Sequence, residues 1–236
     1  MPDFTRLDGR VPGGTPVPET NRPLRLQPDD RLAFFRGFLK RPKQVGSIIP
    51  SSRFLERRVT RATRAHRAKL IVELGPGTGG TTRALLRAMQ PEAQLLAIEI
   101  NPHFVEVLDR WPDKRLIVVR GSAVDIGAIL AARGLPAPDV IVSGIPFSTM
   151  TMPIGRDILR SVYDALDPGG AFVAYQVRDR VNMLGREVFG RARVQTELLN
   201  VPPMRIYRWE KHAVSAPHTV SAQSNVPERN SVATLK

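Results

Sequence analysis

The sequence lacks cysteine, lacks any long apolar run and contains few aromatic residues. Without cysteine the chain can form neither disulfide bonds nor thiolate metal sites. No run of about 18 apolar residues occurs, so we expect no membrane-spanning helix. The opening stretch, MPDFTRLDGRVPGG, lacks the apolar core of a secretory signal. These absences favour a cytoplasmic protein whose 236 residues form one domain with appendages.

Acidic residues are also scarce, because 22 Asp and Glu stand against 35 Lys and Arg, for a formal net charge of +13. Such an excess attracts an anionic partner, either nucleic acid or an acidic membrane face, although it also serves general solubility. The charge is concentrated, since residues 31–69 contain twelve Lys or Arg and one acid, Glu56. This concentration favours a docking surface.

Both ends of the chain differ in composition from its middle. Residues 1–28 are rich in Pro, Gly and charge, and residues 213–236 are polar and show no pattern. We therefore predict disorder at both ends. Residues 68–212 contain the apolar runs of a folded domain, and residues 29–67 precede it as a basic, helical cap.

The cap is predicted to contain two helices. The first begins at Asp29 and Asp30 and ends before Pro42, with an apolar face next to basic residues. The second begins near Ser51 and Ser52. An aromatic face beside positive charge is typical of a helix that lies in a membrane interface, although packing against the domain is the alternative. The candidate membrane-binding residues are Phe34, Phe35, Phe38, Arg36, Lys40 and Arg41.

Strands and helices alternate after residue 69. The short β-branched runs are KLIVEL, QLLAIEI, RLIVVR, PDVIVSG and GAFVAYQV, with amphipathic stretches such as TTRALLRAM between them. RVQTELLNV and RIYRWE follow as a hairpin pair. Alternation of this kind predicts an α/β, Rossmann-like fold with a mostly parallel, seven-stranded sheet covered by helices on both faces.

A glycine loop follows the first predicted strand in IVELGPGTGG. Gly75, Gly77 and Gly80 satisfy the spacing G-x-G-x-x-G of the dinucleotide fingerprint, which alone is a weak signal. These glycines let the backbone adopt positive φ and approach a ligand closely, and Gly79 is a further cofactor-binding candidate. Glu73 decides more, because a carboxylate there repels the pyrophosphate of NAD but can hold the ammonium group of S-adenosylmethionine (SAM). The loop therefore predicts SAM as cofactor and S-adenosylhomocysteine (SAH) as product.

Further residues are predicted to hold the nucleoside. Glu99 and Ile100 end the second strand, and an acid at that position accepts hydrogen bonds from ribose hydroxyls. Ser122 and Ala123, after the third strand, are placed to border the adenine. The turn LDPGG before the fifth strand recurs in class I methyltransferases.

Residues 34–211 resemble the bacterial phospholipid N-methyltransferases of the Rossmann-like type. The resemblance is carried by FFRGFLKRPKQVGSIIPSS, VELGPGTGG, SGIPFS and NVPPMRIYRWEK. It implies stepwise methylation of phosphatidylethanolamine to phosphatidylcholine by a protein bound to the inner face of the cell membrane. Ornithine-lipid methyltransferases are similar. The resemblance also implies that Gly46 and Ser47, with Gln44, close over the methionine end of the cofactor.

The rRNA adenine dimethylases are similar too, and they are the competing interpretation. Those enzymes carry an Asn-Leu-Pro-Tyr type of motif after the fourth strand, whereas this chain has Ser-Gly-Ile-Pro-Phe. A serine hydroxyl cannot reproduce the reach of the amide. The short stretch after the last predicted strand also leaves no room for their helical RNA-binding domain, so a lipid is favoured over RNA. The candidate catalytic residues are Ser143, Gly144, Ile145, Pro146, Phe147 and Tyr175, with Ser143 also near the cofactor.

Two arginines, Arg178 and Arg205, are candidates for binding the lipid phosphate. The four histidines do not cluster, so no general base is assigned, and no metal-ligand spacing occurs. A third interpretation is a peripheral membrane or nucleic-acid binding protein that keeps the SAM fold without turnover. The joint presence of Glu73, the glycines and Glu99 argues against it.

Overall fold

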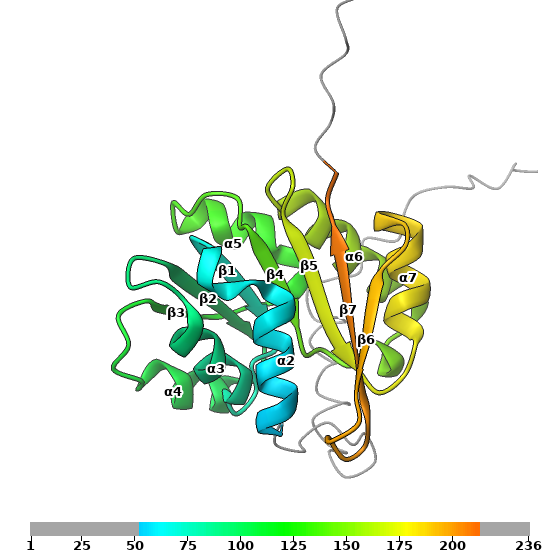
Figure 1. The fold of residues 1–236 in the computed structure, drawn as a ribbon. Helices are drawn as coiled ribbons and strands as arrows, with labels where there is room; N and C mark the ends of the chain where they lie inside the picture. Colours follow the sequence, from blue (N-terminus) through cyan, green and yellow to red (C-terminus); the bar gives the residue numbers. More distant parts are fainter. Residues whose placement is uncertain (1–51, 213–236) are drawn as a thin grey trace, which may run out of the picture. The chain divides into compact units, whose positions relative to one another are not determined.

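A computed structural model describes residues 52–212. Seven strands form one sheet in the order β3-β2-β1-β4-β5-β7-β6 (Figure 1). The strands are β1 (Leu70–Leu74), β2 (Gln94–Glu99), β3 (Leu116–Arg120), β4 (Val140–Ser143), β5 (Ala171–Gln176), β6 (Arg193–Glu197) and β7 (Met204–Glu210). Strands β1 to β5 are parallel, and β7 is antiparallel to both β5 and β6. The predicted fold class and the final hairpin are confirmed.

Helices cover both faces of the sheet (Figure 1). The helices α2 (Arg53–Thr63), α3 (Gly80–Ala88) and α4 (Pro102–Asp109) lie on one face, and α5 (Ile126–Ala132), α6 (Met152–Ala165) and α7 (Arg180–Phe189) on the other. All residues of β1, β4 and β5 are buried, as expected for strands between two helical layers.

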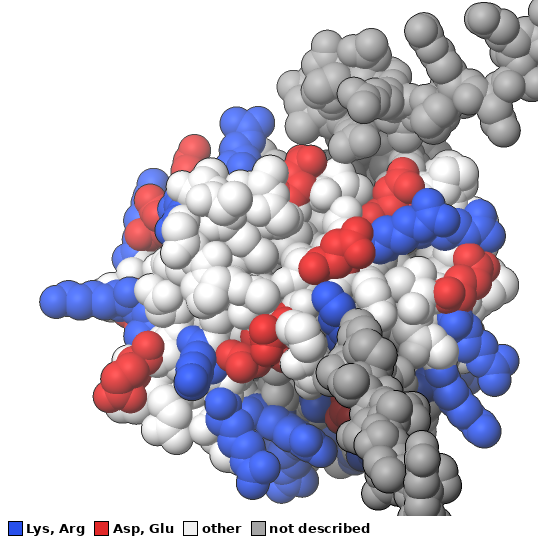
Figure 2. Space-filling model, turned by 90° about the horizontal axis from the view of Figure 1, so that it is seen from above, with Lys and Arg blue, Asp and Glu red and all other residues white. Residues whose placement is uncertain are grey.

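Helix α2 begins where its sequence predicts a cap. The Ser52 hydroxyl accepts the amide hydrogen of Leu55 at 3.2 Å, which satisfies one of the free donors of the first turn. Leu55 and Val59 are buried against the sheet and α3. The stripe on the other side of the helix is exposed and consists of Arg53, Arg57, Arg61 and Arg64. In Figure 2, which views the end of the sheet opposite to the β6–β7 turn, basic side chains gather at the margin on the side of α2.

An aromatic cluster fixes the antiparallel half of the sheet to α7. Trp209 stacks between Phe172 and Tyr207 at centroid distances of 5.4 and 5.7 Å. The α7 backbone approaches this cluster so closely at Gly185 that a Cβ atom there would overlap the indole of Trp209. The packing sets the position of β7, and with it the turn that joins β6 to β7.

The predicted first helix and most of the cap lie outside the described residues. The same holds for Phe34, Phe35, Phe38, Arg36, Lys40, Arg41, Gln44, Gly46 and Ser47, and for the two predicted disordered ends. Within residues 52–212 no helix has the length and apolar character needed to cross a membrane.

Candidate functional site

The candidate site lies where the parallel strands end. Strand register pairs Leu74 with Ser143, and Ser143 with Ala174, so the chain leaves β1, β4 and β5 at one edge. In open α/β sheets ligands bind at this carboxyl edge. The glycine loop, Glu99 and the segment 143–147 therefore come together, as their spacing predicts.

The glycine loop has the expected positive φ at Gly75 and Gly77, whereas Gly80 begins α3 and Gly79 takes the third left-handed position in its place. Gly75, Gly77 and Gly79 have φ values of 69°, 57° and 83°, a region that residues with a side chain rarely adopt. The Gly75 amide donates to the Ile98 carbonyl at 2.9 Å, which ties the loop to β2. A Cβ atom at Gly79 would lie 2.7 Å from the Leu108 side chain, so close packing also requires glycine there.

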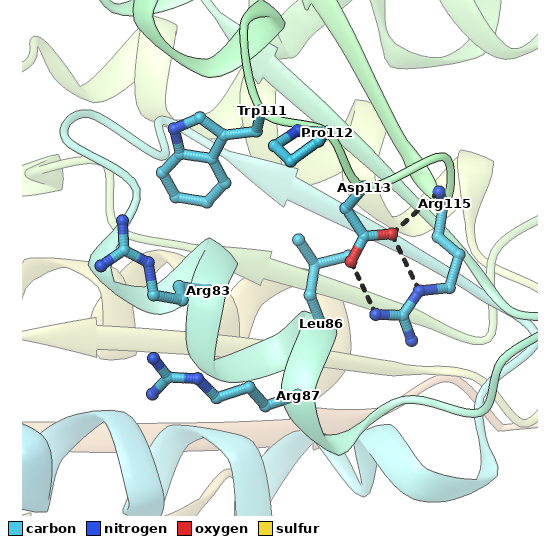
Figure 3. A pocket seen from close by; sticks show the side chains of 7 residues that line it. All are labelled: Arg83, Leu86, Arg87, Trp111, Pro112, Asp113 and Arg115. Carbon is cyan, nitrogen blue, oxygen red and sulfur yellow. Dashed lines mark hydrogen bonds and ion pairs between the residues drawn. The ribbon is translucent and has the colours of Figure 1, made fainter.

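A surface pocket of about 310 Å³ lies next to this loop, on the outer side of α3 (Figure 3). Trp111, which also packs against Gly79, lies in cation–π contact with Arg83 at 5.0 Å. Asp113 and Arg115 form an ion pair at 2.7 Å. The pocket is lined by Arg83, Leu86, Arg87, Trp111, Pro112, Asp113 and Arg115. None of the predicted site residues lines this pocket. We therefore interpret Trp111, at its rim, as a residue that supports the glycine loop by packing against it.

Glu73 is a buried carboxyl without a hydrogen-bond partner. It has 0% exposure, and neither of its oxygens has a partner within residues 52–212. Burial raises the pKa of Glu73 to about 7; the nearby Thr82 hydroxyl lowers it, although no hydrogen bond closes between them, and the negative charge of Glu99 raises it. An unpaired buried acceptor costs free energy. The arrangement is complementary to a cationic donor.

Tyr175 and Glu56 lie on the same face of the sheet as Glu73. The Thr81 hydroxyl donates to the Tyr175 hydroxyl oxygen at 3.2 Å. Burial, reinforced by the charge of Glu73, raises the pKa of Tyr175 far above its usual range, so the phenol stays protonated. Gly144 leaves space for this phenol, because a Cβ atom there would overlap its oxygen.

The Glu99 carboxylate accepts hydrogen bonds from backbone amides, one of which belongs to the glycine loop. One oxygen accepts the amide hydrogens of Ile100 and Asn101, both at 2.9 Å, and the other accepts that of Gly77 at 3.1 Å. These bonds use about three of its four lone-pair positions. The remaining position is available to a ribose hydroxyl, and burial raises the pKa of this carboxyl.

The adenine-binding candidates follow the end of β3. Ser122 is half-buried and Ala123 is buried, and Gly121 before them donates its amide hydrogen to the Glu99 carbonyl at 3.0 Å. They therefore lie beside Glu99, in the neighbourhood that the prediction requires. Their contact with adenine stays a prediction.

The segment 143–147 is less open than its predicted role requires. The Ser143 hydroxyl accepts the Ile145 amide hydrogen at 3.2 Å, and the Ile145 carbonyl accepts a hydrogen bond from Gln176 at 2.7 Å. Phe147 has 0% exposure and contributes to the core, whereas Pro146 is half-buried. In this conformation the aromatic ring does not face an acceptor, so the predicted catalytic role of Phe147 requires movement.

The two candidate phosphate-binding arginines lie at the same edge. Arg178 is exposed two residues after the end of β5, and no ion pair to it occurs within residues 52–212. Arg205 pairs with Asp179, which also accepts from the Tyr207 hydroxyl. Arg178 is therefore the better-placed cation for an incoming anion.

Two features of the site escaped the sequence analysis. Glu56, the single acid of the basic segment, points from α2 toward the start of α3, with an oxygen 3.0 Å from where a Cβ of Gly80 would lie. Burial raises its pKa. Thr81 and Thr82 contribute hydroxyls below the loop. An isolated acid among twelve cations was the available signal for Glu56.

These features fit SAM. The unpaired, buried carboxyl of Glu73 matches an ammonium group, the positive-φ glycines allow close backbone approach, and Glu99 retains an acceptor for a hydroxyl. No cluster of three or more metal-binding side chains occurs in residues 52–212.

Comparisons with known proteins agree. No family model matches the chain. Ornithine lipid N-methyltransferase of Singulisphaera acidiphila is 32% identical over 145 residues, covering 61% of this chain and 76% of that enzyme. Ribosomal RNA small subunit methyltransferase A of Caulobacter vibrioides is 35% identical over 98 residues, covering 40% of this chain and 36% of its own length. This chain thus spans about a third of that relative.

Among solved structures, the 1,6-didemethyltoxoflavin-N1-methyltransferase of Burkholderia thailandensis, with bound SAH, superposes with a TM-score of 0.57 at 14% identity. The superposition covers 82% of this chain and 93% of that one, and it shows the fold. The ornithine lipid enzyme shows more, because it exceeds 30% identity over three quarters of its length. The chain therefore belongs to that enzyme's family, and it is a SAM-dependent methyltransferase of the lipid N-methyltransferase type.

Proposed function

We propose that this protein methylates the amine of phosphatidylethanolamine, and of its methylated intermediates, toward phosphatidylcholine at a membrane surface. The observation that carries the methyl-donor half of the proposal is the buried, unpaired carboxyl of Glu73 below the glycine loop. The acceptor half is supported by family membership and by the exposed cation Arg178 at the same edge.

The residues of the chain act mainly by positioning. When bound, SAM supplies an electrophilic methyl group on sulfur. Glu73 would hold the ammonium end of bound SAM and Glu99 a ribose hydroxyl, so that these two residues would fix the orientation of the methyl donor. Alignment of this kind can contribute roughly 7–11 kcal/mol to catalysis. Arg178 attracts the anion next to the acceptor amine.

The acceptor nitrogen forms its bond to carbon with its lone pair, and the sulfur keeps the electron pair of the bond that breaks. The ammonium form must first lose its proton. Tyr175 does not accept it, because burial raises its pKa. His66, His103 and His212 are exposed and lie outside the site. We propose that the proton passes to water.

A second lipid acceptor is favoured by one observation. The relative that is 32% identical is an ornithine lipid N-methyltransferase. Ornithine carries a primary amine and, like phosphatidylethanolamine, an anion in the same headgroup. The charges at this edge suit either lipid.

An RNA acceptor has less support. The Ser143 hydroxyl, which stands where the dimethylase motif has an amide, is buried and occupied by the Ile145 amide of its own loop. Because this hydroxyl is buried and already accepts a hydrogen bond, it is less available to an adenine than the amide of the dimethylase motif.

The test is methyl transfer from labelled SAM to vesicles of phosphatidylethanolamine, to vesicles of ornithine lipid and to rRNA, in parallel. We expect label in phosphatidylethanolamine. Label in ornithine lipid alone would reassign the acceptor to the second candidate. Label in rRNA alone, or SAM binding without transfer to any of the three, would refute a lipid methyltransferase.

A further inference from the structure

The turn between β6 and β7 lies at the edge of the sheet that carries the site. Strand β7 is antiparallel to β5, and its second residue, Arg205, pairs in register with Gln176, the last residue of β5. The turn, residues 198–203, therefore extends beyond the carboxyl ends of the parallel strands. In Figure 1 it lies beside the N-terminal end of α2.

This turn exposes large apolar side chains. Leu198, Leu199 and Val201 are 72%, 63% and 81% exposed, the highest values for large apolar side chains in residues 52–212. Val177, directly after β5, and Met183, in the first turn of α7, are also exposed. Clustered exposed apolar residues on one edge mark an interaction surface, whereas scattered ones do not.

The polar side chains here, Asn200 of the turn and Glu197 at the end of β6, point inward. Asn200 is buried; its side-chain oxygen accepts the Ser52 amide hydrogen at 3.1 Å, and its side-chain nitrogen donates to the Pro202 carbonyl at 2.8 Å. Glu197 accepts the Leu199 amide hydrogen at 2.9 Å. A turn that faces only water would place these groups outside. Because these inward hydrogen bonds fix the backbone of the turn, its apolar side chains are held in exposed positions.

Glu197 also anchors the turn to α2, because its carboxylate accepts a hydrogen bond from Arg58 at 2.7 Å. The interaction lowers the pKa of Glu197, so this carboxyl stays charged at neutral pH. The two acids next to the turn, Glu197 and Asp179, are thus both paired with arginine.

The remaining charge around the turn is positive. Arg53 and Arg57 are exposed in the first two turns of α2, whereas Glu56 between them points toward α3, and Arg178 is exposed after β5. No ion pair between these three arginines and another side chain occurs within the described part of the chain. Apolar side chains surrounded by cations match a membrane whose surface carries anionic headgroups.

We propose that the β6–β7 turn docks on an anionic lipid bilayer, with Leu198, Leu199 and Val201 inserted among the acyl chains and Arg53, Arg57 and Arg178 at the headgroups. This inference rests on the proposed function only in its purpose, which is to bring the site edge to a lipid amine. In the sequence, this docking site lies near the C-terminal end of the domain, whereas the predicted helix 29–41 precedes the domain.

The test is flotation of the full chain with vesicles of phosphatidylcholine and phosphatidylglycerol, which contain no acceptor amine. Combined Leu198→Ser, Leu199→Ser and Val201→Ser is expected to lower the partition coefficient by about tenfold or more, because three exposed apolar side chains are lost. Val194→Thr is the matched control, since Val194 is 49% exposed on β6 but lies away from the turn, and it should partition as the wild type does. SAH affinity and the melting temperature should be unchanged in both.

A direct readout of insertion uses Leu199→Trp against Val194→Trp. The fluorescence of the first should shift to shorter wavelength when vesicles are added, and that of the second should not. Equal partitioning of the triple variant and the wild type would overturn the proposal. The proposal would also be overturned if deletion of residues 29–41 abolished vesicle binding while the triple variant bound normally. A dimer of the wild type that the triple variant abolishes would overturn it as well.

The failure of docking and the failure of the proposed function give different results. On a short-chain phosphatidylethanolamine below its micelle concentration, the triple variant should methylate at the wild-type rate, while its rate on vesicles falls. If neither protein methylates either lipid but flotation still differs, the docking surface stands and the proposed function fails.

Discussion

Replacement of Glu73 by glutamine is expected to stabilise the ligand-free protein at pH 8 while weakening its binding of SAH. Burial raises the pKa of Glu73 to about 7, from 4.5 for an exposed carboxyl. A group that binds its proton more tightly when folded makes unfolding easier as the pH rises between those two values. At about 1.36 kcal/mol per tenfold change in proton affinity, the charged carboxylate costs the folded state about 3 kcal/mol above pH 7.

Glutamine is uncharged at every pH, so the variant lacks this cost. Thermal unfolding at pH 8 should give a melting temperature roughly 6–12 °C above the wild type, and the difference should disappear near pH 4.5. Glu187→Gln is the control, because Glu187 is exposed and its ion pair with Arg156 lowers the pKa of the Glu187 carboxyl. This control should show no stabilisation at pH 8.

The same substitution removes the negative partner of an ammonium group. SAH affinity, measured by calorimetry at pH 8, should fall about tenfold to a hundredfold, the value of a charge-assisted hydrogen bond. Wild-type affinity should itself decline below pH 7, because binding then requires a proton to leave Glu73. A variant that is less stable at pH 8, or that binds SAH as tightly as the wild type, would refute the reasoning.

Three further predictions test packing and hydrogen bonding at the site and at the β6–β7 turn. Gly144→Ala should destabilise by about 1–3 kcal/mol through overlap with the Tyr175 phenol, and Tyr175→Phe should restore part of the loss, as denaturant unfolding of the single and double variants will show. Gly79→Ala should lower both stability and SAH affinity, because its φ of 83° and its contact with Trp111 exclude a Cβ, and a normal affinity would contradict this. Asn200→Ala should cost about 1–3 kcal/mol in urea unfolding, because it leaves the half-buried Ser52 amide at the start of α2 without its acceptor, and an unchanged midpoint would contradict it.

The local features of this protein could be predicted from its sequence. The strands are continuous β-branched runs, and the positive φ of Gly75 and Gly77 follows from glycine spacing at the end of β1. The hairpin of β6 and β7 follows from the two prolines between its apolar runs. These properties depend on neighbouring residues, which is why pattern alone suffices.

Side-chain placement over long sequence separations could not be predicted. Ser52 and Asn200 are 148 residues apart, yet their hydrogen bond positions the turn that exposes Leu198 and Leu199. Phe147 follows a turn that resembles an acceptor-binding loop, but packing on α6 and α7 buries its ring. Tertiary contacts decided both positions.

The most direct test of the central claim is a crystal structure of the protein with SAH. We predict that the ammonium group lies within hydrogen-bond distance of the Glu73 carboxylate, directly or through one water molecule, with a ribose hydroxyl on Glu99. An ammonium group held elsewhere, with both Glu73 oxygens still unpaired, would contradict the account.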